Sequence, residues 1–272
     1  MSTPAQQQPF VPVNPVRSGI PLGGLVAEAA EFKETTPVRV SVVGASANLT
    51  ALVAQRVAMA AKYAYVPDCF TEELTARGYR SSRDVPEERL VSFQEGILQR
   101  QVDLFARSAQ SAQGVVFHGG PVEVLAFSLR NYSRVDACRG DLPRLRETAT
   151  RIQWLYDVTV IVPWDGLDRR AAQGTPTDGD LLLKHCLLTG VAIELAQRIA
   201  QTSPSSATLV PLDFTVADRE QWVLQVLGAI DELRRRRYAS ALSGPKPSVR
   251  PPSPDLTREG VERDRQGLGD VR

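Results

Sequence analysis

The chain has 272 residues, 43% of them hydrophobic, and its 32 basic and 31 acidic residues leave a net charge of +1. This length and apolar share suit one α/β domain with extensions, or two small domains, with enough apolar side chains for a sizeable core. The near-zero charge gives no general case for binding nucleic acid or an acidic membrane surface.

Cysteine usage and hydropathy predict a cytoplasmic protein. The three cysteines, Cys69, Cys138 and Cys186, are widely spaced and form no CxxC pair, which argues against a disulfide framework and fits a reducing compartment. The polar N-terminus lacks the basic-then-apolar order of a signal peptide. Because no apolar run approaches the roughly 20 residues that span a bilayer, we expect no membrane association.

The two ends of the chain differ in composition from its centre. Residues 1–37 are rich in Gln, Pro and Gly, and their prolines favour an extended chain, so we interpret this stretch as a flexible arm. Residues 239–272 contain almost no large apolar side chains and are predicted to be a disordered, Pro- and Arg-rich tail. The folded domain is therefore expected to span residues 38–238.

Within this domain, short apolar runs alternate with longer amphipathic segments. The runs predict strands at 38–43, 64–66, 114–117, 158–162 and 207–210, and the segments predict helices at 50–62, 91–109, 122–130, 142–154, 181–201 and 217–238. Continuous β-branched runs such as VRVSVV and VTVIV suit strands that are buried on both faces. Alternating strands and helices imply a parallel sheet, in which ligands bind beyond the carboxyl ends of the strands.

The first predicted strand ends in the turn GASANLT, residues 44–50. This strand, turn and helix resemble the P-loop of nucleoside and nucleotide kinases, including the P-loop kinases that DNA-hypermodifying phages use on bases. In that family GxxxxGK[ST] wraps phosphates with bare backbone N–H groups. Gly44 matches the first glycine, whereas Leu49, Thr50 and Ala51 stand at the second glycine, the lysine and the Mg²⁺-binding hydroxyl.

These departures change the chemistry of the turn. Without the lysine, the β and γ phosphates lack their usual cationic partner, and without a hydroxyl at Ala51 the metal loses a ligand. Leu49 also adds a side chain where the backbone must approach closely. Two interpretations stand at this point. The turn is a plain strand-to-helix connection, or it is the remainder of a phosphate site whose nucleotide-binding candidates are Gly44, Ser46, Asn48 and Thr50.

The end of the second strand carries Asp68. In the resembled kinases a carboxylate here, and an arginine three residues on, engage the acceptor nucleotide; in this chain Thr71 stands at the arginine position. Asp68 is therefore a catalytic candidate by resemblance, and it is equally suited to cap the following helix. The resemblance also makes Gln94 and Gln101 candidates for contact with the acceptor.

The third strand leads into GVVFHGGPVEVLAF, residues 114–127. This stretch keeps the family's proline and its Leu-Ala-aromatic ending, but His118 and Gly119 replace an Asp-Arg pair and Glu123 stands for the second acid. The resemblance thus implies that His118 and Glu123 occupy catalytic positions. A histidine there could accept a proton near neutral pH, and it could equally be a structural hydrogen-bonding residue.

Cationic residues follow the fourth strand and end the last helix. Arg169 and Arg170 fall where the resembled kinases carry a lid over the phosphates, and the alternative is a solvated loop. The run RRRR at 234–237 suits a helix C-terminus and could also contact DNA phosphates. The spacing of cysteines and histidines predicts no metal site.

The resemblance covers about residues 38–235 and implies a three-layer P-loop NTPase-like fold with a parallel sheet of strand order 2-3-1-4-5. Because the catalytic motifs depart from the family pattern at several separate places, we expect a pseudoenzyme with a degenerate Walker A motif, lost or weak phosphotransfer, and a binding or accessory role in nucleotide or DNA metabolism.

Two alternatives stay open. One is an active ATP-dependent kinase, with ATP and Mg²⁺ as cofactors, that acts on a nucleotide or on 5-hydroxymethyluracil in phage DNA. The other is a structural module that binds other proteins. Nucleotide, DNA and protein are therefore all open as partners, and the host cytoplasm would be the location if the protein is viral.

Overall fold

The computed structural model describes residues 37–108, 114–131, 136–164, 178–202, 208–213 and 218–242. Most of both predicted arms lies outside the described residues, and so do the predicted lid arginines Arg169 and Arg170. Among the residues that are described, no helix combines the length and apolar character that a bilayer span requires.

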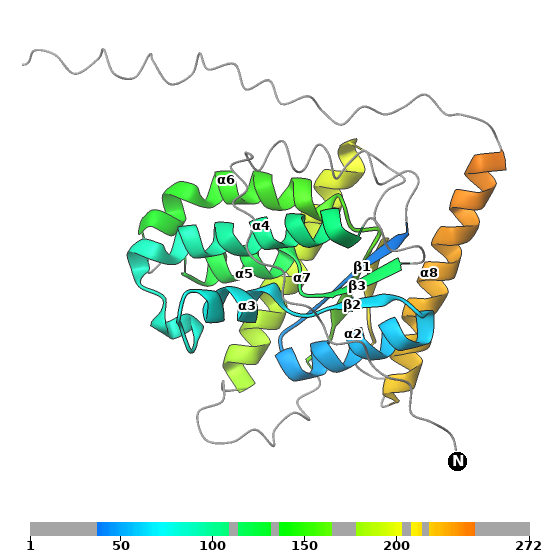
Figure 1. The fold of residues 1–272 in the computed structure, drawn as a ribbon, viewed down its shortest axis with the longest axis horizontal. Helices are drawn as coiled ribbons and strands as arrows, with labels where there is room; N and C mark the ends of the chain where they lie inside the picture. Colours follow the sequence, from blue (N-terminus) through cyan, green and yellow to red (C-terminus); the bar gives the residue numbers. More distant parts are fainter. Residues whose placement is uncertain are drawn as a thin grey trace, which may run out of the picture.

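In the described part of the chain, five parallel strands form one sheet at the centre of the molecule (Figure 1). They are β1 (Val38–Gly44), β2 (Ala64–Val66), β3 (Gly114–His118), β4 (Val158–Val162) and β5 (Thr208–Pro211). The order β2-β3-β1-β4-β5 and the parallel pairing confirm the predicted α/β sheet. Val42 of β1 lies opposite His118, and Gly44 lies opposite Val162, so the carboxyl ends of the three central strands share one edge.

Helices cover both faces of this sheet and give three layers (Figure 1). On one face α2 (Ala47–Ala61) and α8 (Arg219–Leu242) pack on alternate β1 residues such as Val40 and Val42. The other face carries α3 (Cys69–Ala76), α4 (Leu90–Ser108), α5 (Pro121–Asn131), α6 (Asp136–Gln153) and α7 (Asp178–Thr202). Because successive strand residues point to opposite faces, Arg39, Ser41 and Val43 face this second layer.

Several helix boundaries differ from those predicted. The predicted helical segments did not include α3, and two short 3₁₀ turns, Ser82–Asp84 and Glu87–Arg89, connect it to α4. Helix α6 begins at Asp136 rather than at residue 142, so Pro143 lies inside it. Helix α2 begins at Ala47 rather than at residue 50, because Ser46 caps it: the Ser46 hydroxyl accepts a hydrogen bond from the Leu49 N–H.

Candidate functional site

Three predicted catalytic candidates lie around Gly119 at the carboxyl edge of the sheet. His118 ends β3, Asp68 directly precedes α3, and Glu123 stands in the first turn of α5. A Cβ atom placed on Gly119 would lie 2.7 Å from Glu123 Oε2 and 3.5 Å from Asp68 Oδ1. The structure therefore brings the two carboxyl groups to the same glycine, next to the histidine.

The backbone of Gly119 explains why this position cannot hold the arginine of the resembled kinases. Its φ is +89°, a conformation that favours glycine. The Gly119 N–H donates to the carbonyl oxygen of Val42 at 2.8 Å, and the Gly119 carbonyl accepts from the Ser41 hydroxyl at 3.1 Å. A side chain at Gly119 would be strained by this turn and would also collide with the Glu123 carboxyl.

Glu123 carries a carboxyl that titrates near neutral pH. Burial raises its pKa to about 7, and the Asp68 carboxylate adds to this rise. The positive charge of Lys184 and a hydrogen bond from the Gly44 backbone act in the opposite direction and lower the pKa. A group with this pKa can give or take a proton at neutral pH. Glu123 thus has the acid–base chemistry expected of a functional carboxyl.

His118 is held in its neutral form. Burial lowers the pKa of its imidazole, the Asp68 carboxylate opposes that shift, and Lys184 adds to it. The imidazole is therefore free of charge at neutral pH and can accept a proton or a hydrogen bond.

Lys184 of α7 is the residue of this site that sequence analysis missed. Its charge acts on both Glu123 and His118. The sequence predicted a helix over this segment, but no motif marks the lysine, and only the docking of α7 against the sheet edge turns it toward the site. It supplies a cation close to the strand ends, where the turn after β1 has Thr50 at the position that the resemblance assigns to a lysine.

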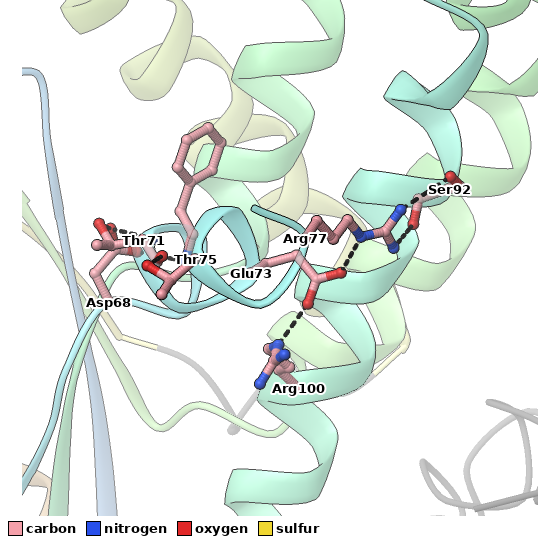
Figure 2. Close-up of polar contacts among 8 residues, drawn as sticks. Asp68, Thr71, Glu73, Thr75, Arg77, Ser92 and Arg100 are labelled. Carbon is pink, nitrogen blue, oxygen red and sulfur yellow. Dashed lines mark hydrogen bonds and ion pairs between the residues drawn. The ribbon is translucent and has the colours of Figure 1, made fainter. Parts of the chain in front are cut away.

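Asp68 acts as a helix cap. Its Oδ1 accepts the Phe70 N–H at 2.8 Å, and its Oδ2 accepts the Thr71 N–H at 3.3 Å and the Thr71 hydroxyl at 2.9 Å (Figure 2). Of the two roles open to Asp68, the structure therefore shows the cap. Both oxygens already have hydrogen-bond partners, and the carboxylate contributes its charge to the site.

A buried ion-pair cluster fixes α3 against α4 and so holds Asp68 in place (Figure 2). The Glu73 carboxylate, in a residue 5% exposed, accepts from Arg77 Nε at 2.6 Å and from Arg100 Nε at 2.5 Å. Arg77 also donates to the Ser92 carbonyl at 2.7 Å. A Cβ on Gly96 would lie 2.2 Å from Glu73 Oε1, so the close approach of the two helices requires a glycine there.

The turn after β1 is short and closed. Only Ala45 and Ser46 separate Gly44 from the first residue of α2. The Leu49 N–H donates to the Ser46 hydroxyl at 3.3 Å, the Thr50 N–H donates to the Ser46 carbonyl at 2.9 Å, and the Thr50 hydroxyl donates to the same carbonyl at 2.7 Å. Leu49 and Thr50 are buried in the core, at 4% and 0% exposure. Asn48 is exposed on the first turn of α2.

Gly44 is required by the packing of this turn, which gives a first prediction. A Cβ on Gly44 would lie 2.3 Å from Thr50 Oγ1 and 3.0 Å from Val162 Cβ. We expect Gly44→Ala to lower the free energy of unfolding by about 1–3 kcal/mol through overpacking, measured by urea denaturation. Thr50→Ala in the same chain should recover part of that loss because it removes the nearest atom. A Gly44→Ala variant as stable as the wild type would contradict this packing.

Cys69 does not supply a nucleophile in the folded protein. Burial raises the pKa of the Cys69 thiol far above its ordinary value, and the neighbouring carboxylates of Glu72 and Asp68 raise it further. A thiol in this state is inert, because the thiolate is the reactive form. Among the described residues, no group of His, Cys, Asp and Glu side chains is arranged to hold a metal ion.

Thiol labelling gives a second prediction. Cys69 is buried and Cys186 is exposed. In a Cys138→Ser background, we expect the native protein to react with one equivalent of a thiol reagent at Cys186. Cys69 should react at least about 100-fold more slowly, because the protein must first open locally. Unfolding in urea should make the two rates equal. Rapid labelling of both cysteines in the folded protein would show that Cys69 is accessible.

The basic run 234–237 was predicted to end the last helix, but α8 continues to Leu242 and its last turn has no basic residue. The run lies against carboxylates of the same chain. Its charge is therefore partly balanced internally, which weakens the predicted contact with DNA, although exposed pairs of this kind are individually weak. The pairs are Arg234–Asp231 at 3.7 Å, Arg235–Glu232 at 3.4 Å, Arg236–Glu232 at 3.0 Å, and Arg237–Asp157, in addition to a contact of Arg234 with the Tyr63 ring.

The fold and its edge site define a parallel α/β protein with a cluster of titratable groups where such sheets bind ligands. No family model matches the chain, and no curated protein matches it. The resemblance to P-loop kinases therefore stays a prediction.

Proposed function

We propose that this protein is a divergent relative of the P-loop nucleoside and nucleotide kinases that has lost the triphosphate cradle and acts by binding a nucleotide or nucleoside in an accessory role. The observation that carries the proposal is the closed turn after β1. The N–H groups of Leu49 and Thr50 are bonded to Ser46, and both side chains are buried. A P-loop instead leaves a run of N–H groups free for the phosphates.

ATP and Mg²⁺ do not fit this turn in the manner of a P-loop. Thr50 stands where the lysine would be, and its hydroxyl is bonded inside the helix to the Ser46 carbonyl at 2.7 Å. Ala51 offers no oxygen to a metal. These residues support a turn whose role is to connect β1 to α2.

The remaining groups at the sheet edge suit a ligand that has both hydroxyl and anionic groups. Lys184 provides a positive charge, neutral His118 accepts a hydrogen bond, and Glu123 donates or accepts one according to its protonation. A nucleoside monophosphate has the matching chemistry, with a phosphate for the lysine and sugar hydroxyls or base edges for the other two.

Calorimetry on the full chain tests this proposal. We expect no heat from millimolar ATP, with or without Mg²⁺, and measurable binding of a nucleoside monophosphate. Lys184→Gln should weaken that binding about tenfold or more, because it removes one charge-assisted contact, and Lys184→Arg should restore most of it. Micromolar ATP binding would overturn the loss of the cradle. Failure of every nucleotide to bind would favour a structural module that binds other proteins.

An active phosphotransferase is the second candidate, and the pairing of Lys184 with Glu123 favours it. A cation and a carboxyl that titrates near pH 7 are groups that such a reaction uses. The assay is transfer of labelled phosphate to nucleotides and to DNA that contains 5-hydroxymethyluracil. Transfer that is lost in Glu123→Gln would establish this candidate over the accessory role.

A further inference from the structure

The outward face of α7 is apolar and exposed to solvent. Leu182, Leu183 and Ile193 are 47%, 50% and 43% exposed, and they are three of the six large hydrophobic side chains that are exposed among the described residues. Single exposed apolar residues are ordinary, whereas a group of them on one surface marks a place of contact. We call the exposed residues that recur here at helical spacing the α7 face: Leu182, Leu183, Cys186, Gly190 and Ile193.

The charged residues of α7 lie beside this face and not on it. Asp180 pairs with Arg130 of α5 at 3.3 Å, and Lys184 acts on the sheet-edge site. Glu194 pairs with Arg198 at 3.0 Å. A surface helix normally presents polar and charged residues to water and turns its apolar residues inward. The inward side of α7 is apolar as well, with Leu188, Val191, Ala192 and Leu195 in the core.

The α7 face is complementary to itself under a two-fold axis. If a second, antiparallel copy of α7 crosses at Leu188, Cys186 of one copy lies against Gly190 of the other, and Leu183 lies against Ile193, because both pairs are centred on residue 188. A Cβ placed on Gly190 would meet nothing within 4 Å, so there is room at this glycine for a side chain of the second copy. Contacts between identical surfaces of this kind give closed dimers.

The charges beside the face favour the antiparallel direction. Asp180 and Arg198 are separated by about five helical turns, so they lie on the same flank at opposite ends of α7. In an antiparallel pair each lies near the opposite charge of the other copy, whereas a parallel pair brings like charges together. Both side chains are partly exposed, at 38% and 42%. Exposed pairs add little affinity, but they select the orientation.

We propose that the α7 face is the interface of a symmetric dimer of this chain, in which the two α7 helices pack antiparallel. A second copy is the occupant that fits, because the face matches itself in its apolar residues and in the charges at its ends. One helix face buries less than the about 800 Å² per partner of a standard interface, so the dimer is weak, with a Kd on the order of 10–100 µM. Cys186 therefore stays reactive at low micromolar concentration.

The test is sedimentation of the full chain from about 1 µM to about 1 mM, a range that spans this Kd. We expect the average mass to rise from that of one copy toward that of two. Ile193→Glu places a charge in the interface and should raise the Kd about tenfold or more. The matched control is Leu224→Glu on α8, at a leucine that is 64% exposed and outside the α7 face, and it should leave the Kd unchanged. A chain that is monomeric across the whole range would overturn the proposal.

Cysteine pairing tests the antiparallel geometry. Leu183→Cys and Ile193→Cys are made in separate chains, each with Cys138→Ser and Cys186→Ser. When the two chains are mixed and oxidised, we expect a disulfide between them and none within dimers of either chain alone, because only residues 183 and 193 of different copies come within disulfide distance. Dimers of Leu183→Cys linked to itself would contradict the antiparallel contact. Protection of wild-type Cys186 from thiol reagents that is independent of concentration would also overturn the dimer, since another part of the same chain, such as residues 1–36, would then cover the face.

Discussion

Replacing Asp157 by asparagine is expected to lower the free energy of unfolding by about 3–5 kcal/mol, as removal of one partner from a buried ion pair does. Asp157 is 1% exposed and accepts hydrogen bonds from the Arg39 backbone and the Arg237 guanidinium. Asparagine keeps the shape but removes the negative charge, so two neighbouring cations lose the carboxylate between them. Urea denaturation followed by circular dichroism would measure the loss.

A matched control is Glu232→Gln on the surface of α8. Glu232 also pairs with two arginines, Arg235 and Arg236, but these side chains are exposed, so we expect a change in stability much smaller than that of Asp157→Asn. The double variant Asp157→Asn, Arg237→Met should cost less than the sum of its two single variants, because both remove the same interaction. An Asp157→Asn variant that loses no more than the Glu232 control would show that Asp157 does not hold α8 to the sheet.

The sheet could be predicted from the sequence because its strands carry a strong local signal. The run VTVIV was predicted as 158–162, and β4 has those bounds. VRVSVV was interpreted as a strand buried on both faces, and in β1 even Arg39 and Ser41 are buried. The strand order was predicted from the resemblance to P-loop kinases rather than from the strands themselves, because apolar runs do not indicate which strands are neighbours.

The start of α2 could not be predicted in the same way. The alignment to the P-loop pattern placed the start of this helix at residue 50 and left Leu49 in the loop, whereas Ser46 is a good N-cap residue and begins the helix at Ala47. The local capping preference and the family pattern conflicted, and the capping preference prevailed. Leu49, apolar and buried, is a core residue of that helix.

The site was predictable where it depends on strand ends and unpredictable where it depends on helix docking. His118 ends β3, Asp68 directly precedes α3, and Glu123 lies in the first turn of α5, all at the same sheet edge, so topology alone brings them together. Lys184 reaches the site from a helix far along the chain, and no spacing in the sequence encodes how that helix is rotated. The same limit applies to Arg39: that its Nε and Nη1 atoms have no hydrogen-bond partner among the described residues is visible only once Asp157 and Arg237 are in place.

Glu123 should make the stability of the protein fall as the pH rises from about 4.5 to about 7. The Glu123 carboxyl has a pKa of about 7 in the folded protein and an ordinary value of 4.5. Between these values the unfolded chain has released the proton and the folded protein still holds it, so unfolding releases a proton and becomes easier as the pH increases. The shift corresponds to about 3 kcal/mol of lost stability, and the loss is complete above the folded pKa.

Glu123→Gln isolates this contribution, because glutamine resembles the protonated carboxyl at every pH. The variant should match the wild type at about pH 4.5 and exceed its stability by about 3 kcal/mol at about pH 8. Glu88→Gln, at an exposed carboxyl, should show no such divergence. If the free energies of unfolding of Glu123→Gln and the wild type differ by the same amount at every pH in this range, Glu123 is ionised throughout. Glu123 would then not gain or lose a proton near neutral pH, and the acid–base chemistry of the site depends on that proton.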